Sequence, residues 1–245
     1  MLLRRINLHL KQQNWTAVIL DFLVVVLGIV VGLQITDWNE QRKDNAKEQQ
    51  YLSQIYRDFG VNIEKANALV AHHDERVNDS MYAISKIIKQ KPQDDEEAER
   101  FKWAVLTLKQ RPPLMLEMGG YNALIAAGDF ALIRDNELRN LFIRIDSAIT
   151  TDKEMLDIFA GQDWNEQDQL RIGKTLPHPS GRGLAFEVDY DYVANHPQSL
   201  SVFSAWRRSH ATLRDYRSYL AKLFTDARER IKVVNNQPSD TENSQ

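Results

Sequence analysis

Residues 15–38 read WTAVILDFLVVVLGIVVGLQITDW, and this stretch decides the fold. Between residues 16 and 36 the only ionisable side chain is Asp21. A helix rises about 1.5 Å per residue, so about 20 apolar residues cross a hydrocarbon core that is about 30 Å thick. Trp15 and Trp38 bound the run, as expected of anchors at the two membrane interfaces, where amphipathic rings settle. The sequence therefore predicts one uncleaved transmembrane helix over 15–38, held in the lipid bilayer, because the QITDWNEQRK that follows lacks a small-residue cleavage pattern.

The charges that flank the run bear on its orientation. Positive-inside counting compares Lys and Arg in the two short flanks. These are nearly equal, with Arg4, Arg5 and Lys11 before the run and Arg42, Lys43 and Lys47 after it. Acidic residues reduce the net positive charge of the second flank, and the amino terminus adds a positive charge to the first. We predict that residues 1–14 form a short cytoplasmic tail and that the large domain lies on the other side of the membrane.

One face of the predicted membrane helix carries its unusual residues. At about 100° per residue, a stripe about 80° wide contains Asp21, Val25, Gly28, Gly32 and Ile35. The two glycines form a G-x-x-x-G pair, which lets helix backbones approach closely in lipid. This predicts a membrane-helix contact, either with a second copy of the chain or with another membrane protein. The alternative is an acid that reaches the headgroup region beside two incidental glycines.

Two segments resemble a bacterial single-pass membrane family of unknown function. Residues 21–43, DFLVVVLGIVVGLQITDWNEQRK, have the family's acid, its apolar LVVxGI-type run and its LQ-x-x-(N/D)-WNE-x-RK exit. Asp21 stands where the family usually has Glu, and Gly28 matches the central glycine. Residues 121–141, YNALIAAGDFALIRDNELRNL, are similar to the family's soluble-side motif. The resemblance implies a single-pass bacterial protein with a helical domain, and it supplies no activity. Together with the orientation predicted from the flanking charges, it places the protein in the bacterial inner membrane with a periplasmic C-terminal domain.

Composition narrows the remaining classes of function. The net charge of −3 gives no nucleic-acid-binding surface, and the absence of cysteine excludes disulfides and zinc–thiolate sites. There is no H-E-x-x-H, no complete phosphate loop and no G-x-S-x-G. We therefore expect no catalytic residues, no cofactor and no metal.

The chain after the membrane run has helical spacing over most of its length. Apolar side chains recur at steps of three and four from residue 39 to about 90, which predicts a long helix that continues out of the membrane and ends at Lys91-Pro92. Further helices are expected near 94–108, 121–128, 136–170 and 197–234, with Asp135 as a cap, a break at Gly128 and a kink or restart at Thr151. The predicted fold is all-α: one N-terminal transmembrane helix followed by an elongated helical bundle of coiled-coil type over 39–234. A short irregular loop is expected at 171–196, with one strand-like turn at its FEVDYDYV alternation, and a disordered tail at 235–245.

The histidines are the remaining candidates for chemistry. His72-His73-Asp74-Glu75 is the densest set of metal-ligating residue types, and we interpret it as a solvated helical turn. The helical stripes nevertheless contain His73 and, in the last helix, His210. The leading hypothesis is a membrane-anchored, non-catalytic interaction or scaffold module. The alternatives are a ligand-sensing bundle that signals through a partner membrane protein and an enzyme with an unfamiliar site.

Overall fold

The computed structural model describes residues 15–89, 91–161, 173–177 and 184–236. The chain divides into two units, Met1–Gln50 and Tyr51–Gln245. The predicted all-α class is confirmed, with one long apolar helix near the N-terminus followed by a packed helical bundle. The first helix among the described residues, α2, runs from Trp15 to Ile88 and thus continues through the position where the predicted membrane run ends.

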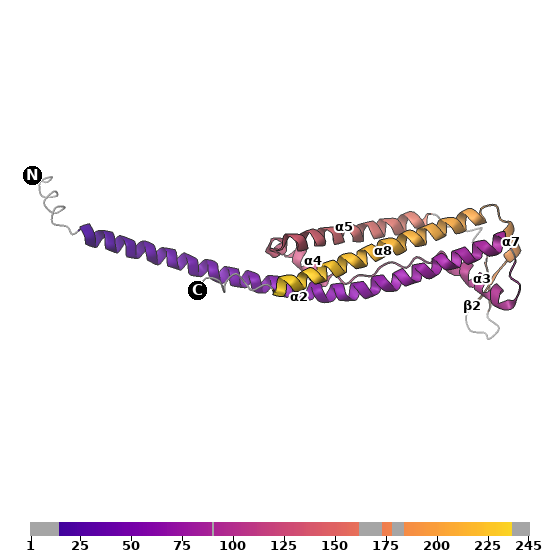
Figure 1. Cartoon of the computed structure of the whole chain (residues 1–245), viewed down its shortest axis with the longest axis horizontal. Helices are drawn as coiled ribbons and strands as arrows, with labels where there is room; N and C mark the ends of the chain where they lie inside the picture. Colours follow the sequence, from indigo (N-terminus) through magenta and orange to yellow (C-terminus); the bar gives the residue numbers. More distant parts are fainter. Residues whose placement is uncertain (1–14, 90, 162–172, 178–183, 237–245) are drawn as a thin grey trace, which may run out of the picture. The chain divides into compact units, whose positions relative to one another are not determined.

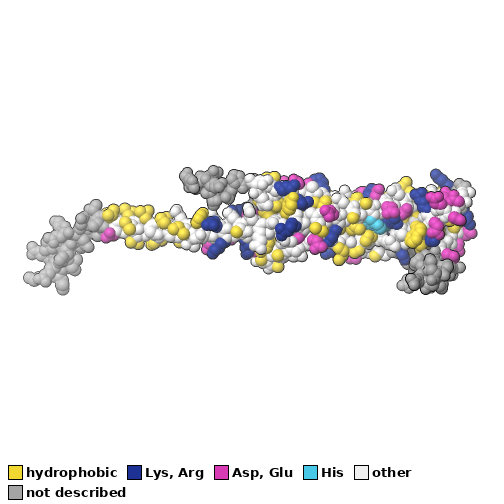
Figure 2. All heavy atoms as spheres, turned by 90° about the horizontal axis from the view of Figure 1, so that it is seen from below, with side chains coloured by type: hydrophobic (Ala, Val, Ile, Leu, Met, Phe, Trp, Pro, Cys, Tyr) yellow, Lys and Arg dark blue, Asp and Glu magenta, His cyan; other side chains and the backbone are white. Residues whose placement is uncertain are grey.

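The first unit holds the apolar part of α2. Every side chain from Ile19 to Asp44 is exposed. In Figure 2, apolar side chains gather along the first part of this segment, and charged ones appear where it approaches residue 44. Among the described residues, α2 is the one helix long and apolar enough to cross a membrane by length and composition. Thr36 donates its hydroxyl to the Gly32 carbonyl at 3.1 Å, so this polar group is satisfied within the helix itself.

The second unit is a helical bundle. α5 and α8 lie side by side in Figure 1, and the part of α2 that belongs to this unit packs against α8. Shorter elements connect the long helices. The bounds are α3 (Asp95–Thr107), α4 (Gly119–Ala126), the 3-10 helix η1 (Asp129–Leu132), α5 (Asn136–Ala160), α7 (Tyr190–Asn195) and α8 (Ser199–Asn236).

Two apolar clusters stabilise this bundle. The larger joins α2, α4, α5 and α8, where Phe59 stacks against Phe224 with ring centroids 4.9 Å apart. The smaller joins the end of α2 to α3, α7 and the start of α8, around Phe203 and Trp206. Both clusters are built from the apolar stripes that the sequence predicts, since helices take most of their stability from such packing.

Local chemistry fixes the start of α4 and of α5. Asp58 on α2 accepts the Gly120 N–H at 2.7 Å, and a Cβ at Gly120 would lie 2.9 Å from the Ile55 nitrogen, so only glycine allows this close approach. Gly128 ends α4 with φ of 74°, as the predicted break requires. Asp135 caps α5 by accepting the Leu138 N–H, which confirms the predicted cap.

The structure corrects the prediction in three places. The segment expected to be an irregular loop with one strand-like turn contains two paired antiparallel strands, β1 (Gly173–Pro177) and β2 (Leu184–Val188), and then α7. Thr151 does not restart a helix, because α5 runs unbroken past it and the Thr151 hydroxyl donates to the Ser147 carbonyl one turn earlier. The predicted helix beyond 161 and the predicted tail at 1–14 lie outside the described residues. The predicted tail at 235–245 is wrong for its first two residues, which end α8, and its remainder lies outside the described residues.

Candidate functional site

The predicted membrane-helix face lies on α2 in the first unit. Asp21, Val25, Gly28, Gly32 and Ile35 are all exposed, and a Cβ at either glycine would meet nothing within 4 Å. This face is therefore available to a neighbouring helix.

The two predicted interface anchors bound the same segment. Trp15 is the first residue of α2. Trp38 is about half exposed, and the Arg42 guanidinium lies 5.0 Å from its ring centroid. An aromatic ring beside a cation suits the boundary between hydrocarbon and headgroups.

The second unit contains a group of charged and polar side chains where a helical bundle normally has apolar ones. We call it the buried polar layer; it separates the two apolar clusters along α8, where Phe203 and Trp206 precede it and Leu220 and Phe224 follow it. His73, His210 and Arg217 have no exposed surface, and Asp152 has 3%. The layer comprises His73 on α2, Asp152 on α5, His210 and Arg217 on α8, and the Leu108 carbonyl after α3.

A continuous row of hydrogen bonds joins the members of the layer. His210 Nε2 lies 2.6 Å from the Leu108 carbonyl oxygen, and its Nδ1 lies 2.8 Å from Nδ1 of His73. His73 Nε2 is 2.7 Å from Arg217 Nη1. Arg217 donates from Nε to Asp152 Oδ1 at 3.0 Å and from Nη2 to Oδ2 at 3.4 Å. The row thus ties α2, α5, α8 and the segment after α3 together.

The partners at the two ends fix where the ring protons sit. The Leu108 carbonyl only accepts, so His210 carries its proton on Nε2 and presents a bare Nδ1. His73 must then donate from Nδ1, which leaves its Nε2 bare. Arg217, which only donates, meets that bare nitrogen. Every contact is satisfied when both imidazoles are neutral, and all four ring nitrogens are engaged.

Burial and nearby cations favour the same neutral state. Burial is the largest cause that lowers the pKa of His73, to about 2, followed by the Arg217 charge. Burial also lowers the pKa of His210 to about 4, although its bond to the Leu108 carbonyl acts in the opposite direction. A proton on either ring is therefore disfavoured by desolvation as well as by hydrogen-bond geometry.

The interpretation of His72-His73-Asp74-Glu75 as a solvated turn is wrong for one residue. Asp74 and Glu75 are exposed, whereas His73 is fully buried. The helical stripe had assigned His73 and His210 to core-facing positions, and that signal was correct. Sequence reasoning missed Arg217 and Asp152, because nothing local marks a charged residue whose partner is 65 positions away.

Comparison with known proteins supplies no assignment. No family model, curated protein or solved structure matches this chain. The resemblance of residues 21–43 and 121–141 to a bacterial membrane family therefore stays a prediction, and function has to be argued from geometry.

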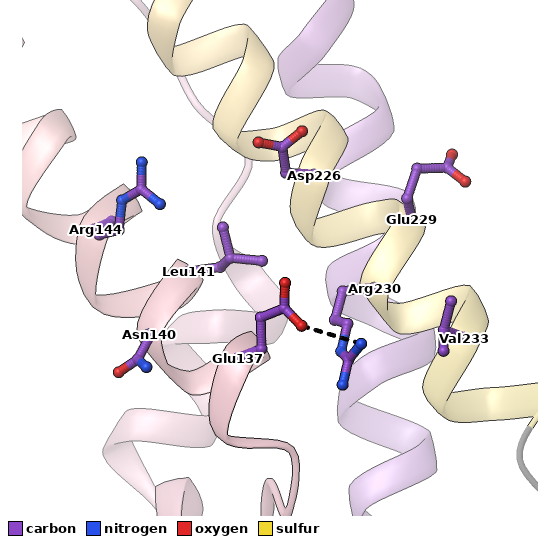
Figure 3. A pocket seen from close by; sticks show the side chains of 8 residues that line it. All are labelled: Glu137, Asn140, Leu141, Arg144, Asp226, Glu229, Arg230 and Val233. Atoms are coloured by element: carbon purple, nitrogen blue, oxygen red, sulfur yellow. Dashed lines mark ion pairs between the residues drawn. The ribbon is translucent and has the colours of Figure 1, made fainter.

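A groove of about 610 Å³ lies between α5 and α8 (Figure 3). Its walls carry both signs of charge. Glu137 and Arg230 face one another across it and pair at 3.0 Å, while Asp226 pairs with Lys222 along α8. Charges that are matched in this way give no concentrated field for a ligand of one sign, and no member of the buried polar layer lines the groove. We assign no binding site to it.

Proposed function

We propose that this chain is a single-pass, membrane-anchored helical interaction module that performs no catalysis of its own. The observation that carries the proposal is the exposed apolar segment of α2. Its side chains from Ile19 to Ile35 are bare in the chain by itself, although this run contains the highest density of large apolar residues. An uncovered apolar surface of this length needs a medium or a partner that covers it.

The energetics favour lipid as that medium. Insertion contributes about −0.3 to −0.6 kcal/mol for each Leu, Ile, Phe or Val at the centre of a membrane helix. The exposed large apolar residues of the run then sum to roughly −4 to −8 kcal/mol, against about +3 kcal/mol for an acid at the helix centre. These residues are Ile19, Leu20, Phe22, Leu23, Val24, Val25, Val26, Leu27, Ile29, Val30, Val31, Leu33 and Ile35. The balance favours insertion even with Asp21 in the run.

A role in interaction follows from what the bundle offers. The members of the buried polar layer bond to one another, and the groove between α5 and α8 has paired charges along its walls. Neither arrangement presents a nucleophile and base to a bound molecule. The membrane-helix face with Gly28 and Gly32 supports contact with a second copy of the chain or with another membrane protein.

Topology is tested by fusing a reporter after Gln245 in a bacterial host. We expect activity from a reporter that works only outside the cytoplasm, and none from a reporter that works only inside it. The chain should also stay in the membrane fraction after alkaline carbonate washing. Release into the soluble fraction would refute the anchor, and cytoplasmic reporter activity would refute the orientation.

The helix contact is tested by substitution on two faces of the same segment. Gly28→Ile with Gly32→Ile should weaken self-association in a membrane two-hybrid assay, because the larger side chains keep the backbones apart. Val26→Ile with Val30→Ile is the matched control, since these positions lie about 200° away around the helix. If the two double variants gave the same self-association signal, the proposed self-association through the Gly28 and Gly32 face would be refuted. A different membrane partner would then be sought by crosslinking.

A further inference from the structure

We propose that the buried polar layer is an acid-sensitive switch: protonation of the His73–His210 pair separates α2 from α8 and opens the end of the bundle that holds the smaller apolar cluster. The proposal stands on the hydrogen-bond row itself, in which each bare nitrogen faces a donor. It does not depend on the membrane assignment, so either can fail alone.

One added proton is enough to break the row. If His73 takes it, Nε2–H points at Arg217 Nη1–H, which lies 2.7 Å away and cannot accept. If His210 takes it, two N–H groups meet across the 2.8 Å gap between the rings. If His73 instead carries its proton on Nε2, that N–H faces the Arg217 N–H, so the conflict moves to the contact between His73 and Arg217. The pair must therefore part to accept a proton.

The charged groups around the pair oppose a second positive charge. α2 contributes His72 and Arg76, α8 contributes Arg217, and the segment after α3 contributes Arg111. The facing carboxylate on α5 is Asp152, which Arg217 already binds. Other acids nearby are paired with arginines: Asp79 with Arg76 in a partly buried pair, and Asp74 with Arg214 at the surface. Among the residues that the structure describes, no group in direct contact with the rings is placed to balance an imidazolium.

The two apolar clusters predict which end opens. Counted over the described residues, the cluster around Phe203 and Trp206 contains eight buried residues and the cluster around Phe59 and Phe224 contains sixteen. The smaller cluster packs α3, α7 and the start of α8 directly against the end of α2, around Ala83, and the buried polar layer borders it at Leu108. Loss of the layer therefore leaves that end with the weaker remaining packing.

The size of the response follows from proton linkage. Consider a histidine whose pKa is near 6.5 when exposed and near 4 or below when buried. Lowering the pH from 8 to 5 then raises the equilibrium constant for opening about 30-fold. Both histidines together raise it about 1000-fold. Above pH 7 the switch is closed, because both exposed and buried rings are then mostly neutral.

Hydrogen exchange with mass spectrometry on the full chain in detergent micelles or nanodiscs measures this opening. On acidification from pH 8 to pH 5, peptides covering residues 95–107 and 190–210 should lose protection relative to peptides covering 52–59 and 138–148 in the same sample. The internal ratio removes the intrinsic pH dependence of exchange. A constant ratio, or equal loss in both regions, would overturn the proposal, because the layer would then not divide the bundle.

Glutamine variants assign the response to the two rings. In His73→Gln the amide oxygen can still accept from Arg217, and in His210→Gln the amide N–H can still donate to the Leu108 carbonyl. Each single variant should reduce the pH response to about 30-fold, and the double variant should abolish it. His196→Gln, outside the layer, is the control and should respond like the parent chain. An unchanged response in the double variant would overturn the proposal.

A spectroscopic measurement keeps the test decisive if the variants fold poorly. Selective ¹⁵N labelling of histidine reports ring protonation in the unaltered chain. At pH 7 we expect one buried ring protonated only on Nδ1 and another only on Nε2. An imidazolium signal from either buried ring at pH 7 would contradict the tautomers and with them the switch.

Discussion

Arg217→Met tests the electrostatic reasoning most directly. The Arg217 side chain has no exposed surface and that of Asp152 has 5%, and they are bonded at 3.0 Å. Removing the cation leaves a carboxylate in the core with no counter-charge and leaves His73 Nε2 without its donor. Breaking a buried pair in this way costs about 3–5 kcal/mol, which corresponds to a fall in Tm of roughly 6–20 °C for a domain of this size.

The assay is thermal and urea unfolding of the full chain in a mild detergent, followed by near-ultraviolet circular dichroism. Arg214→Met is the matched control, because Arg214 lies on the same helix but pairs with Asp74 at the surface, where such a pair contributes about 0–1 kcal/mol. Adding Asp152→Leu to Arg217→Met should restore part of the lost stability, since the stranded charge is gone. A loss no larger than that of Arg214→Met would refute the reasoning.

Three further predictions concern pH and backbone. Burial lowers the pKa values of His73 and His210 below the unfolded value of 6.5, so the stability that these neutral rings contribute is complete above pH 7 and is lost as pH falls. Between pH 8 and pH 5 the free energy of unfolding, measured by urea unfolding, should drop by about 2 kcal/mol for each ring. Gly120→Ala should destabilise by about 1–3 kcal/mol because its Cβ would meet α2 at 2.9 Å, whereas Gly119→Ala, with 3.7 Å to its nearest neighbour, should not. Gly128→Ala should cost about 1–2 kcal/mol in thermal unfolding because φ there is 74°.

Local signals in the sequence were sufficient for most of the helical architecture. The apolar stripes locate the faces that pack, and Asp135 and Gly128 mark a helix start and a helix end with chemistry that acts within a few residues. Such signals need no knowledge of the partner. The prediction of a helix restart at Thr151 failed because the continuing apolar face of α5 overrides a capping pattern inside a strongly amphipathic stretch.

Long-range pairings could not be predicted from the sequence. The hairpin depends on register between Gly173 and Val188, and the periodic signal there is too short to separate a strand pair from a loop. The buried polar layer depends on contacts such as His73 with His210, 137 positions apart. A stripe shows that a histidine faces the core, but only the packed helices show what it meets.

The position of the layer suggests why a helical bundle would keep charges in its core. Two apolar stripes can slide past one another by a turn with little loss of contact, because one apolar side chain replaces another. A row of directional bonds from Leu108 through His210 and His73 to Asp152 permits one register of α2, α5 and α8, since any slip leaves buried groups unpaired. The same dependence on unique partners makes the register sensitive to a single proton. Specific assembly and acid sensitivity therefore have one physical origin in this bundle.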